Sequence, residues 1–180
     1  TEFKPYTVKD GLINNYVFCI KEDEKHNLWI GTNNGMSHFN GIAFKNYPVV
    51  GDSAQVWVQE IDIDKKGRKW LATNLGVLMF DPKGASGKNF TNVTQKLKFK
   101  TEVVNALHID HKGNIWFGTG KGLYRIIDKG SSFDFVHYSG VINSITSIKE
   151  DAQGNMWIGT YGDGAYVYNW KRFYRDKCSL

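Results

Sequence analysis

The stretch Asn155-Met156-Trp157-Ile158-Gly159-Thr160 is one of four related versions of a single short motif in this chain. Each version centres on a tryptophan, and successive tryptophans are 41, 46 and 41 residues apart. Self-similarity at such a period is typical of stacked supersecondary units that share one core. We therefore expect these tryptophans to be structural and not catalytic. The other versions are Asn27-Leu28-Trp29-Ile30-Gly31-Thr32, Lys69-Trp70-Leu71-Ala72-Thr73 and Asn114-Ile115-Trp116-Phe117-Gly118-Thr119.

A strand-like run precedes each motif and ends in an aspartate six residues before the tryptophan. β-branched and aromatic residues dominate these runs, and their length fits a strand. Apolar residues recur three and six positions before the aspartate, and because three is odd, we expect them to face opposite sides of the strand. The sequence therefore predicts a sheet covered on both faces. The four aspartates are Asp23, Asp64, Asp110 and Asp151.

The segment from each aspartate to its tryptophan predicts a hairpin turn. Three units place a glycine three residues after the aspartate, as in Asp64-Lys65-Lys66-Gly67, and glycine supplies the positive φ that ends such a turn. His26 stands at this position in the first unit, where we expect a locally different or strained turn. None of these turns has the alternating oxygen ligands of a calcium loop, so we expect no metal and no cofactor.

A glycine after each tryptophan opens a third strand, and a fourth strand follows. The glycine comes six residues after the tryptophan in three units and seven after it in the last, which carries an extra residue in Tyr161-Gly162-Asp163. Four short antiparallel strands per 41–46 residues predict a blade of a β-propeller, and so an all-β fold.

We predict one β-propeller domain over residues 1–180. Phe3-Lys4-Pro5-Tyr6 resembles Phe44-Lys45-Asn46-Tyr47, so residues 1–7 are expected to form an outer strand that closes the ring, a role for which Phe173-Tyr174 competes. The predicted blades span approximately residues 12–47, 53–93, 101–138 and 143–174.

Four blades allow two architectures. One is a closed four-blade ring; the other is half of an eight-blade ring that a second chain completes. An unclosed set of four would expose two apolar blade faces, which promotes association. Our hypothesis is a homodimer with two-fold symmetry.

The composition limits the partners and the location of the chain. The net charge is +5, but the positive residues are scattered and no nucleic-acid module accompanies them, so we expect no nucleic-acid partner. No run of about 18 apolar residues is present, so no direct membrane insertion of this segment is expected. The chain begins at Thr1, which suggests that a preceding segment was removed. Cys19 is predicted to be a buried thiol and Cys178 to be exposed.

The first and last units resemble the two-component regulator propeller repeat. The likeness is carried by Ile20-Lys21-Glu22-Asp23 through Trp29-Ile30-Gly31-Thr32-Asn33-Asn34-Gly35, and by the matching stretch from Ile148 to Thr160. The opening Tyr6-Thr7 with Asp10-Gly11-Leu12-Ile13-Asn14-Asn15 is similar to the start of such arrays. The resemblance implies a ligand-sensing propeller that is periplasmic or otherwise exported. In that family, many members respond to glycan fragments, and binding rather than catalysis is implied.

Candidate ligand-binding residues follow from the loops that enter each first strand and join the second and third strands. In propellers these loops lie at one face, and the repeat does not require their odd residues. Aromatic rings with amide and carboxylate groups suit an oligosaccharide ligand. The candidates are Tyr16, Asn34, Trp57, Tyr161 and Asp163.

Two other functions stay open. One is a structural protein–protein interaction module; the less favoured one is a propeller-type glycan hydrolase or lyase. No nucleophile motif, phosphate loop or zinc signature is present, and no carboxylate pair stands out, so we expect no catalytic residues.

Overall fold

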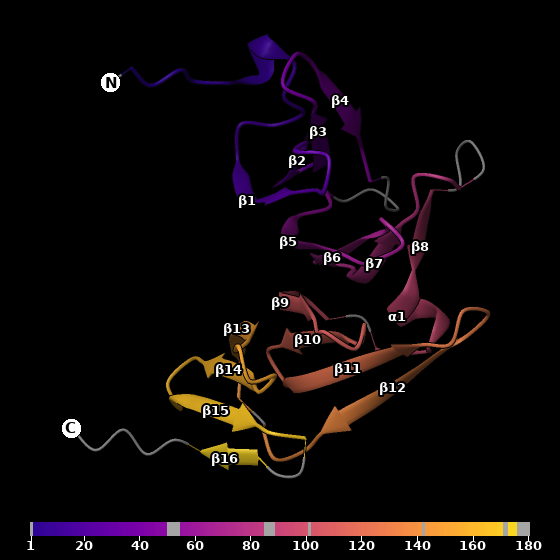
Figure 1. The fold of residues 1–180 in the computed structure, drawn as a ribbon, viewed down its shortest axis with the longest axis vertical. Helices are drawn as coiled ribbons and strands as arrows, with labels where there is room; N and C mark the ends of the chain where they lie inside the picture. The colour runs from indigo at the N-terminus through magenta and orange to yellow at the C-terminus, as the bar shows by residue number, and fades with distance from the viewer. Residues whose placement is uncertain are drawn as a thin grey trace. The chain divides into compact units, whose positions relative to one another are not determined.

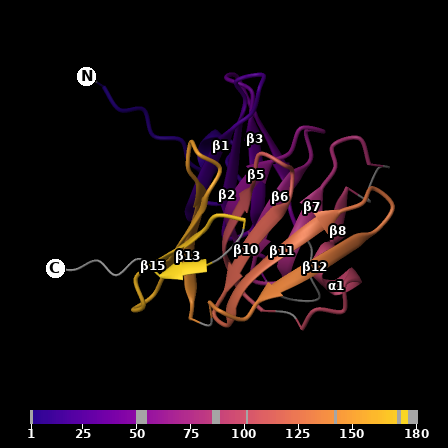
Figure 2. The same cartoon turned by 60° about the horizontal axis from the view of Figure 1, so that its bottom comes forward.

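The computed structural model describes residues 2–49, 55–84, 89–100, 102–141 and 143–170, and the backbone of 173–175. Its regular structure consists of four antiparallel sheets of four strands each, with a 3₁₀ turn η1 (Val8–Asp10) and one short helix α1 (Val93–Lys96) (Figures 1 and 2). The strands of every sheet follow one another in chain order. The prediction of an all-β propeller fold is confirmed. The four sheets span residues 17–47, 58–92, 104–138 and 145–175.

The sixteen strands are short, as expected for blades. The first two sheets comprise β1 (Val17–Glu22), β2 (Leu28–Thr32), β3 (Gly35–Phe39), β4 (Phe44–Tyr47), β5 (Val58–Ile63), β6 (Lys69–Thr73), β7 (Gly76–Phe80) and β8 (Phe90–Asn92). The last two comprise β9 (Val104–Ile109), β10 (Ile115–Thr119), β11 (Gly122–Asp128), β12 (Phe133–Tyr138), β13 (Ile145–Glu150), β14 (Met156–Thr160), β15 (Ala165–Tyr168) and β16 (Phe173–Arg175). We refer to the sheets as blades 1 to 4.

The chain divides into two compact units, Thr1–Ile61 and Asp62–Leu180. Unit 1 holds blade 1 and the start of β5; unit 2 holds the rest of blade 2 and blades 3 and 4. Within unit 2, blade 3 packs against both of its neighbours. One apolar cluster joins blades 2 and 3, and a second joins blades 3 and 4. The core of unit 2 therefore lies between blades, as it does in a propeller.

One hydrogen bond recurs in all four blades and explains the spacing of aspartate and tryptophan. The indole N–H of each tryptophan donates to the carboxylate of the aspartate six residues earlier, at 2.7–3.0 Å. The same carboxylate accepts backbone N–H groups of the turn between them. The aspartate thus fixes the turn and anchors the indole, so its role is structural. The pairs are Asp23–Trp29, Asp64–Trp70, Asp110–Trp116 and Asp151–Trp157.

The turn of blade 1 is the same as the others although it lacks glycine. Gly67, Gly113 and Gly154 have φ of 78°, 85° and 81°, and His26 has φ of 61°. The N–H of His26 donates to Asp23 O at 2.9 Å, as Gly67 N–H does to Asp64 O at 2.8 Å. The expected strain is confirmed, because a side chain here occupies the left-handed region. Of the two alternatives expected here, a different turn or a strained one, the structure shows the strained one.

A β-bulge corrects the prediction that the two apolar positions of the first strand face opposite sides. Val104 and Leu107 both pack in the cluster with blade 2, and Ile145 and Ile148 both pack in the cluster with blade 3. The register of β9 and of β13 shifts between these positions, as it does in β1. A bulge inserts one extra residue, which reverses the alternation of side chains.

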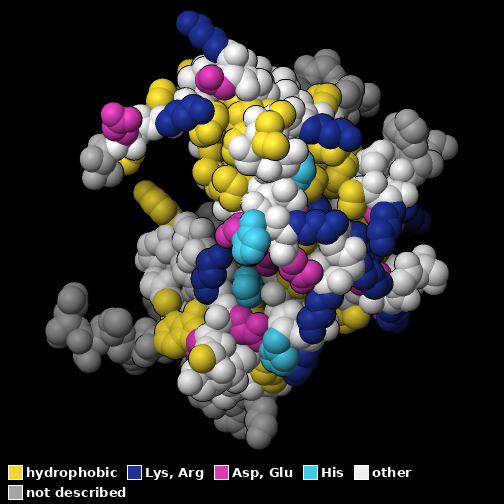
Figure 3. Space-filling view, turned by 45° about the horizontal axis from the view of Figure 1, so that its top comes forward, with side chains coloured by type: hydrophobic (Ala, Val, Ile, Leu, Met, Phe, Trp, Pro, Cys, Tyr) yellow, Lys and Arg dark blue, Asp and Glu magenta, His cyan; other side chains and the backbone are white. Residues whose placement is uncertain are grey.

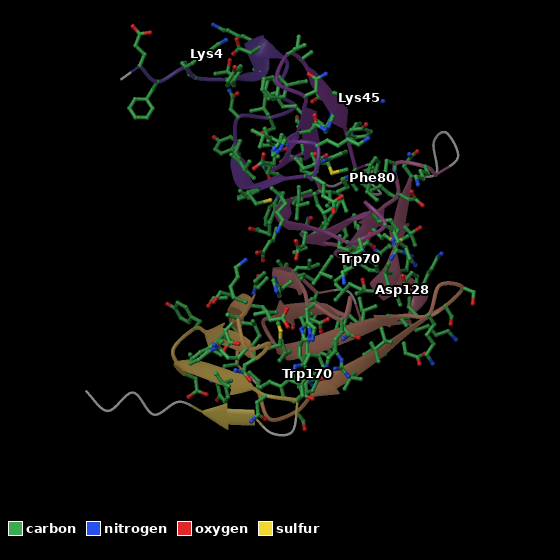
Figure 4. All side chains as sticks on the ribbon, in the orientation of Figure 1. Lys4, Lys45, Trp70, Phe80, Asp128 and Trp170 are labelled. Carbon is green, nitrogen blue, oxygen red and sulfur yellow. The ribbon has the colours of Figure 1, made fainter. Side chains whose placement is uncertain are left out.

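An arginine replaces the asparagine of the motif in blade 2 and links two blades. Arg68 donates to Asp64 Oδ2 and to Asp128 Oδ2, each at 2.6 Å, and its side chain is 14% exposed. Asp128 ends β11 of blade 3, and Figure 4 labels it together with Trp70 of β6. The guanidinium also lies 5.4 Å from the Trp70 ring. This bridge fastens blades 2 and 3 at one end of their strands.

Three features at the edges differ in detail from the sequence expectation. The fourth strand of blade 2 ends at Asn92, whose side chain caps α1 by accepting Gln95 N–H at 2.9 Å. The outer strand of blade 4 is β16, whereas residues 2–7 form no strand. Cys19 is half-buried, with its thiol 3.8 Å from Val58 O, and burial raises its pKa to about 12. Cys178 lies outside the described residues.

Candidate ligand-binding site

Three segments of unit 1 meet at one end of blade 1. The β2–β3 turn donates Asn33 N–H to Tyr16 O at 3.0 Å, which ties it to the segment before β1. The Asn33 amide also donates to Gln55 Oε1 at 3.3 Å, in the segment before β5. The structure therefore brings together the loops that the sequence analysis assigned to one end.

The predicted residues of unit 1 are exposed on these loops. Tyr16 is 71% exposed and Trp57 is 40% exposed, and Asn34 is exposed at the tip of the β2–β3 turn. Tyr16 N–H donates to the Asn14 side chain at 2.8 Å, which fixes the backbone and leaves the ring in solvent. Two aromatic side chains and an amide are thus partly or largely exposed at this end of unit 1.

Unit 2 has an open hollow of about 440 Å³ at the corresponding strand ends of blade 3. Lys121, in the β10–β11 turn, pairs with Glu102, which precedes β9. This hydrogen bond raises the pKa of Lys121, so the ammonium is charged near neutral pH. A cation, an anion and an amide therefore border one concave surface. The hollow is lined by Glu102, Val103, Asn105, Gly120 and Lys121.

The hollow is connected to the loops of blade 4. The Asn105 amide donates to Ile145 O at 3.3 Å, at the start of β13. Next to it, Ser144 O accepts Tyr161 N–H at 2.8 Å. Asn105 was missed by the sequence analysis, although its position carries Phe18, Gln59 and Thr146 in the other blades, which shows that the repeat does not fix it.

The two predicted residues of blade 4 share one turn but differ in availability. Tyr161 is 82% exposed, the highest value among the described tyrosines and tryptophans. Asp163 is half-buried and accepts the hydroxyl of Tyr166, so it is already engaged within its own blade. Tyr161 is therefore the more available candidate in this turn.

A second hollow, of about 250 Å³, lies at the opposite strand ends of blades 3 and 4. Here Glu150 accepts the backbone N–H of His111 at 2.8 Å and also pairs with the His111 ring. These groups bond to each other across the two turns, so this hollow is a contact between blades 3 and 4.

Across the described residues, no group of three or more His, Cys, Asp or Glu side chains is placed to hold a metal ion. None of the helices in the described ranges has the length and apolar character needed to cross a membrane.

Comparison with known families supports the repeat interpretation. The family described as Two component regulator propeller matches residues 11–34, 98–121 and 139–162. These stretches fall in blades 1, 3 and 4 and include the loops that enter β1, β9 and β13. No curated protein sequence matches the chain.

Solved structures share the fold. The extracellular domain of a proposed one component system from B. thetaiotaomicron has a TM-score of 0.70 and 24% identity, over 88% of this chain and 22% of that chain. The extracellular domain of a proposed hybrid two component system from the same organism has a TM-score of 0.52 and 23% identity, over 91% of this chain and 29% of that one. Virginiamycin B lyase from Staphylococcus aureus has a TM-score of 0.73 and 18% identity, over 91% of this chain and 56% of the lyase chain. The chain thus spans less than a third of the length of the two extracellular domains.

Proposed function

Because the chain carries repeats of the two component regulator propeller family, we propose that it is a non-enzymatic, sensor-like binding propeller for a glycan or a related ligand. Binding takes place in unit 2, at the strand ends of blades 3 and 4 that carry Tyr161 and the hollow of about 440 Å³. A periplasmic or otherwise exported location is part of the proposal, as is self-association into a homodimer. Similarity to extracellular sensor domains supports the location.

The observation that carries the proposal is the position of Tyr161. Its ring is 82% exposed in the turn that has one residue more than the other blades need, and its backbone is held by Ser144. A tyrosine on a fixed backbone gives contact area at low entropic cost, because few side-chain torsions have to be ordered. The nearby hollow adds the charged pair and the Asn105 amide, and a few polar groups beside an apolar surface are typical of a small-molecule site.

The test is a glycan array followed by calorimetry with the best oligosaccharide. Tyr161→Ala should weaken binding by about tenfold or more, which corresponds to about 1.4 kcal/mol, because the ring surface is lost. Tyr161→Phe should retain most of the affinity, since it keeps the ring. Phe3→Ala is the matched control, because Phe3 is 95% exposed but lies outside these loops.

The other functions predict different results. Equal affinity of the Tyr161→Ala and wild-type proteins would refute this site. An array without any binding would favour a protein–protein interaction module. Turnover of a bound oligosaccharide, detected by mass spectrometry of the products, would favour a hydrolase or a lyase.

A further inference from the structure

The segment that leads from blade 2 to blade 3 carries three exposed lysines on an anchored backbone. It consists of Lys96-Leu97-Lys98-Phe99-Lys100, and we call it the basic strap. Leu97 and Phe99 pack against the core between blades 2 and 3, whereas the lysines that alternate with them are exposed. Phe99 N–H donates to Thr94 O at 2.9 Å, which ties the strap to α1. The three charges are therefore presented by a segment whose course is fixed.

The repeat does not account for the positive charges at this end of blade 3. The corresponding connections between the other blades, residues 48–57 and 139–144, contain no lysine or arginine. Lys121 lies in the β10–β11 turn, and the matching turns of the other blades contain no basic residue either: residues 33–34, 74–75 and 161–164. Because the fold is common to all blades, charges that only one blade carries are available for recognition.

The basic strap lies beside the hollow of about 440 Å³ in blade 3. Lys100 is two residues before Glu102, which lines the hollow, so their Cα atoms are at most about 7 Å apart. The centroid of the Phe99 ring lies 4.8 Å from that of Tyr124. Burial raises the pKa of Tyr124, as does the charge of Glu102, and the charge of Lys121 lowers it, so these groups are close together. The strap and the hollow therefore form one surface.

Glu102 and Lys121 differ in their exposure at this surface. The two side chains form an ion pair, in which Glu102 is 16% exposed and Lys121 is 66% exposed. An ammonium group has three N–H donors, and Glu102 accepts one of them. The carboxylate is thus largely covered, while the ammonium faces solvent with further donors available. A ligand that enters the hollow meets the cation, which favours an anionic group.

The net charge of this surface is positive. Among the residues that the structure describes, no carboxylate pairs with the strap lysines. The acidic side chains at the same strand ends of blades 3 and 4 are engaged, Glu102 by Lys121 and Asp163 by Tyr166. On the face that Figure 3 displays, by contrast, basic side chains are interspersed with Asp, Glu and His side chains. A surface with one sign of charge attracts ligands of the opposite sign.

Building on the proposed function, we propose that the ligand of this site is an oligosaccharide that carries carboxylate or sulfate groups. Lys121 binds one anionic group in the hollow, and the strap lysines contact further anionic groups along the sugar chain. Glu102 holds the Lys121 ammonium in place. A uronate and a sulfate ester share this chemistry, because an ammonium is a compact point charge with rotatable donors and has no fork geometry to match.

The test compares oligosaccharides that differ only in charge. Uronate oligosaccharides are measured against their methyl esters, and sulfated oligosaccharides against the same chains after desulfation, by calorimetry with the full chain. The charged member of at least one pair should bind about fivefold more tightly or better, which is the upper end of what a single exposed ion pair contributes. The difference should shrink as salt is added, since exposed charges are screened.

Two variants locate the preference for the charged ligand. Lys121→Met should reduce it to about twofold or less, because the cation of the hollow is lost. The combined change Lys96→Gln, Lys98→Gln and Lys100→Gln should reduce both the preference and its dependence on salt, and it affects only exposed side chains. Affinity for the uncharged member should stay the same in both variants, which shows that the site is still folded. Lys129→Gln is the control, because Lys129 is 56% exposed in the β11–β12 turn, at the opposite strand ends.

The outcomes separate this proposal from the proposed function. Equal affinity for the charged and uncharged members of every pair would overturn the anionic class, while the proposed function would stand because a glycan still binds. A preference that persists in both variants would overturn it as well. A DNA oligonucleotide that binds as tightly as the charged oligosaccharide would replace sugar recognition by general binding of polyanions. Absence of binding to all these oligosaccharides would refute the proposed function and this proposal together.

Discussion

The indole N–H of Trp116 donates to Asp110 Oδ2 at 2.7 Å, and both residues are at most 3% exposed. The equivalent pair of blade 4, Asp151 and Trp157, makes the same bond at 2.9 Å with an indole that is 40% exposed. One motif therefore occurs both in the core and at the surface of this chain. This difference in burial allows the motif to be tested with an internal control.

Replacing Asp110 should destabilise the fold strongly. Asp110→Ala leaves the buried indole N–H and the turn N–H groups without their acceptor, so the free energy of unfolding should fall by about 2–4 kcal/mol. Asp151→Ala should cost clearly less, because water replaces the lost acceptor. Urea denaturation followed by tryptophan fluorescence measures both. Equal losses of unfolding free energy in the two variants would contradict the claim that burial makes the Asp110–Trp116 bond the more important one.

Acid should destabilise the chain through its motif aspartates. Burial raises the pKa of Asp23, but hydrogen bonds from the Trp29 indole and from Asn27 outweigh it and lower the pKa to about 2 from an ordinary value of 3.8. Because the folded state holds the charged form, this contribution is complete above about pH 4 and is lost as the pH falls towards 2. The free energy of unfolding should therefore fall as the pH is lowered from about 4 to about 2.

The variant Asp23→Asn isolates that contribution. An amide does not titrate, so its stability curve should be flatter between pH 4 and pH 2 than the wild-type curve. Asp151, whose pKa is also lowered to about 2 by hydrogen bonds from Asn155 and Trp157, supplies an independent second site. If the stability curves of the wild-type and Asp23→Asn proteins are parallel between pH 4 and pH 2, the Asp23 carboxylate does not contribute to the acid sensitivity of the fold.

Close packing between blades 3 and 4 should make Gly118 intolerant of any side chain. Its added Cβ would meet Ile145 at 2.3 Å, so Gly118→Ala should cost about 2 kcal/mol of unfolding free energy through overpacking. Gly120→Ala is the matched control two residues away, because nothing lies within 4 Å of its added Cβ. The prediction fails if both variants unfold at the same urea concentration.

Removing one partner of the bridge between Arg68, Asp64 and Asp128 should destabilise the fold more than removing two partners together. Arg68→Met removes the arginine that two largely buried carboxylates share, while Asp128 keeps the more exposed Lys66 at 3.7 Å, and should cost about 3 kcal/mol. Adding Asp128→Asn removes one of the two buried charges and should recover part of that loss. A double-mutant cycle by chemical denaturation gives the coupling energy. Additive effects of the two changes would contradict a direct bridge between blades 2 and 3.

Most of the fold could be predicted from the repeat, because every blade uses the same residue positions for its turn and its core. The aspartate, the turn glycine and the tryptophan occupy the expected positions, and His26 follows the same backbone path. The bulge in the first strands was not predictable, since the alternation rule assumes a regular strand and gives the opposite side for residues such as Val104 and Leu107.

The polar environment between blades was also not predictable. The strand position two residues before each motif aspartate carries a polar residue in all four blades, a pattern that predicts exposure to solvent: Lys21, Asp62, His108 and Lys149. Asp62 is nevertheless 7% exposed and accepts Ile109 N–H at 2.8 Å. The residues of the candidate site were proposed only in part from the sequence. The sequence proposes its loops and Tyr161, because these break the repeat. The contribution of Asn105 depends on the approach of a neighbouring blade, which no single repeat encodes.

The extra residue of blade 4 is confined to its turn. Thr160 N–H and its hydroxyl both reach Gly164 O, at 3.0 and 2.7 Å, and the ladder resumes with Gly159 opposite Ala165. In the shorter turn of blade 3, Thr119 stands opposite Gly122. An insertion at this tip therefore leaves the strand pairing below it intact. Residues can thus be added to or exchanged in this loop surface, one turn at a time, without a change in the sheet beneath it.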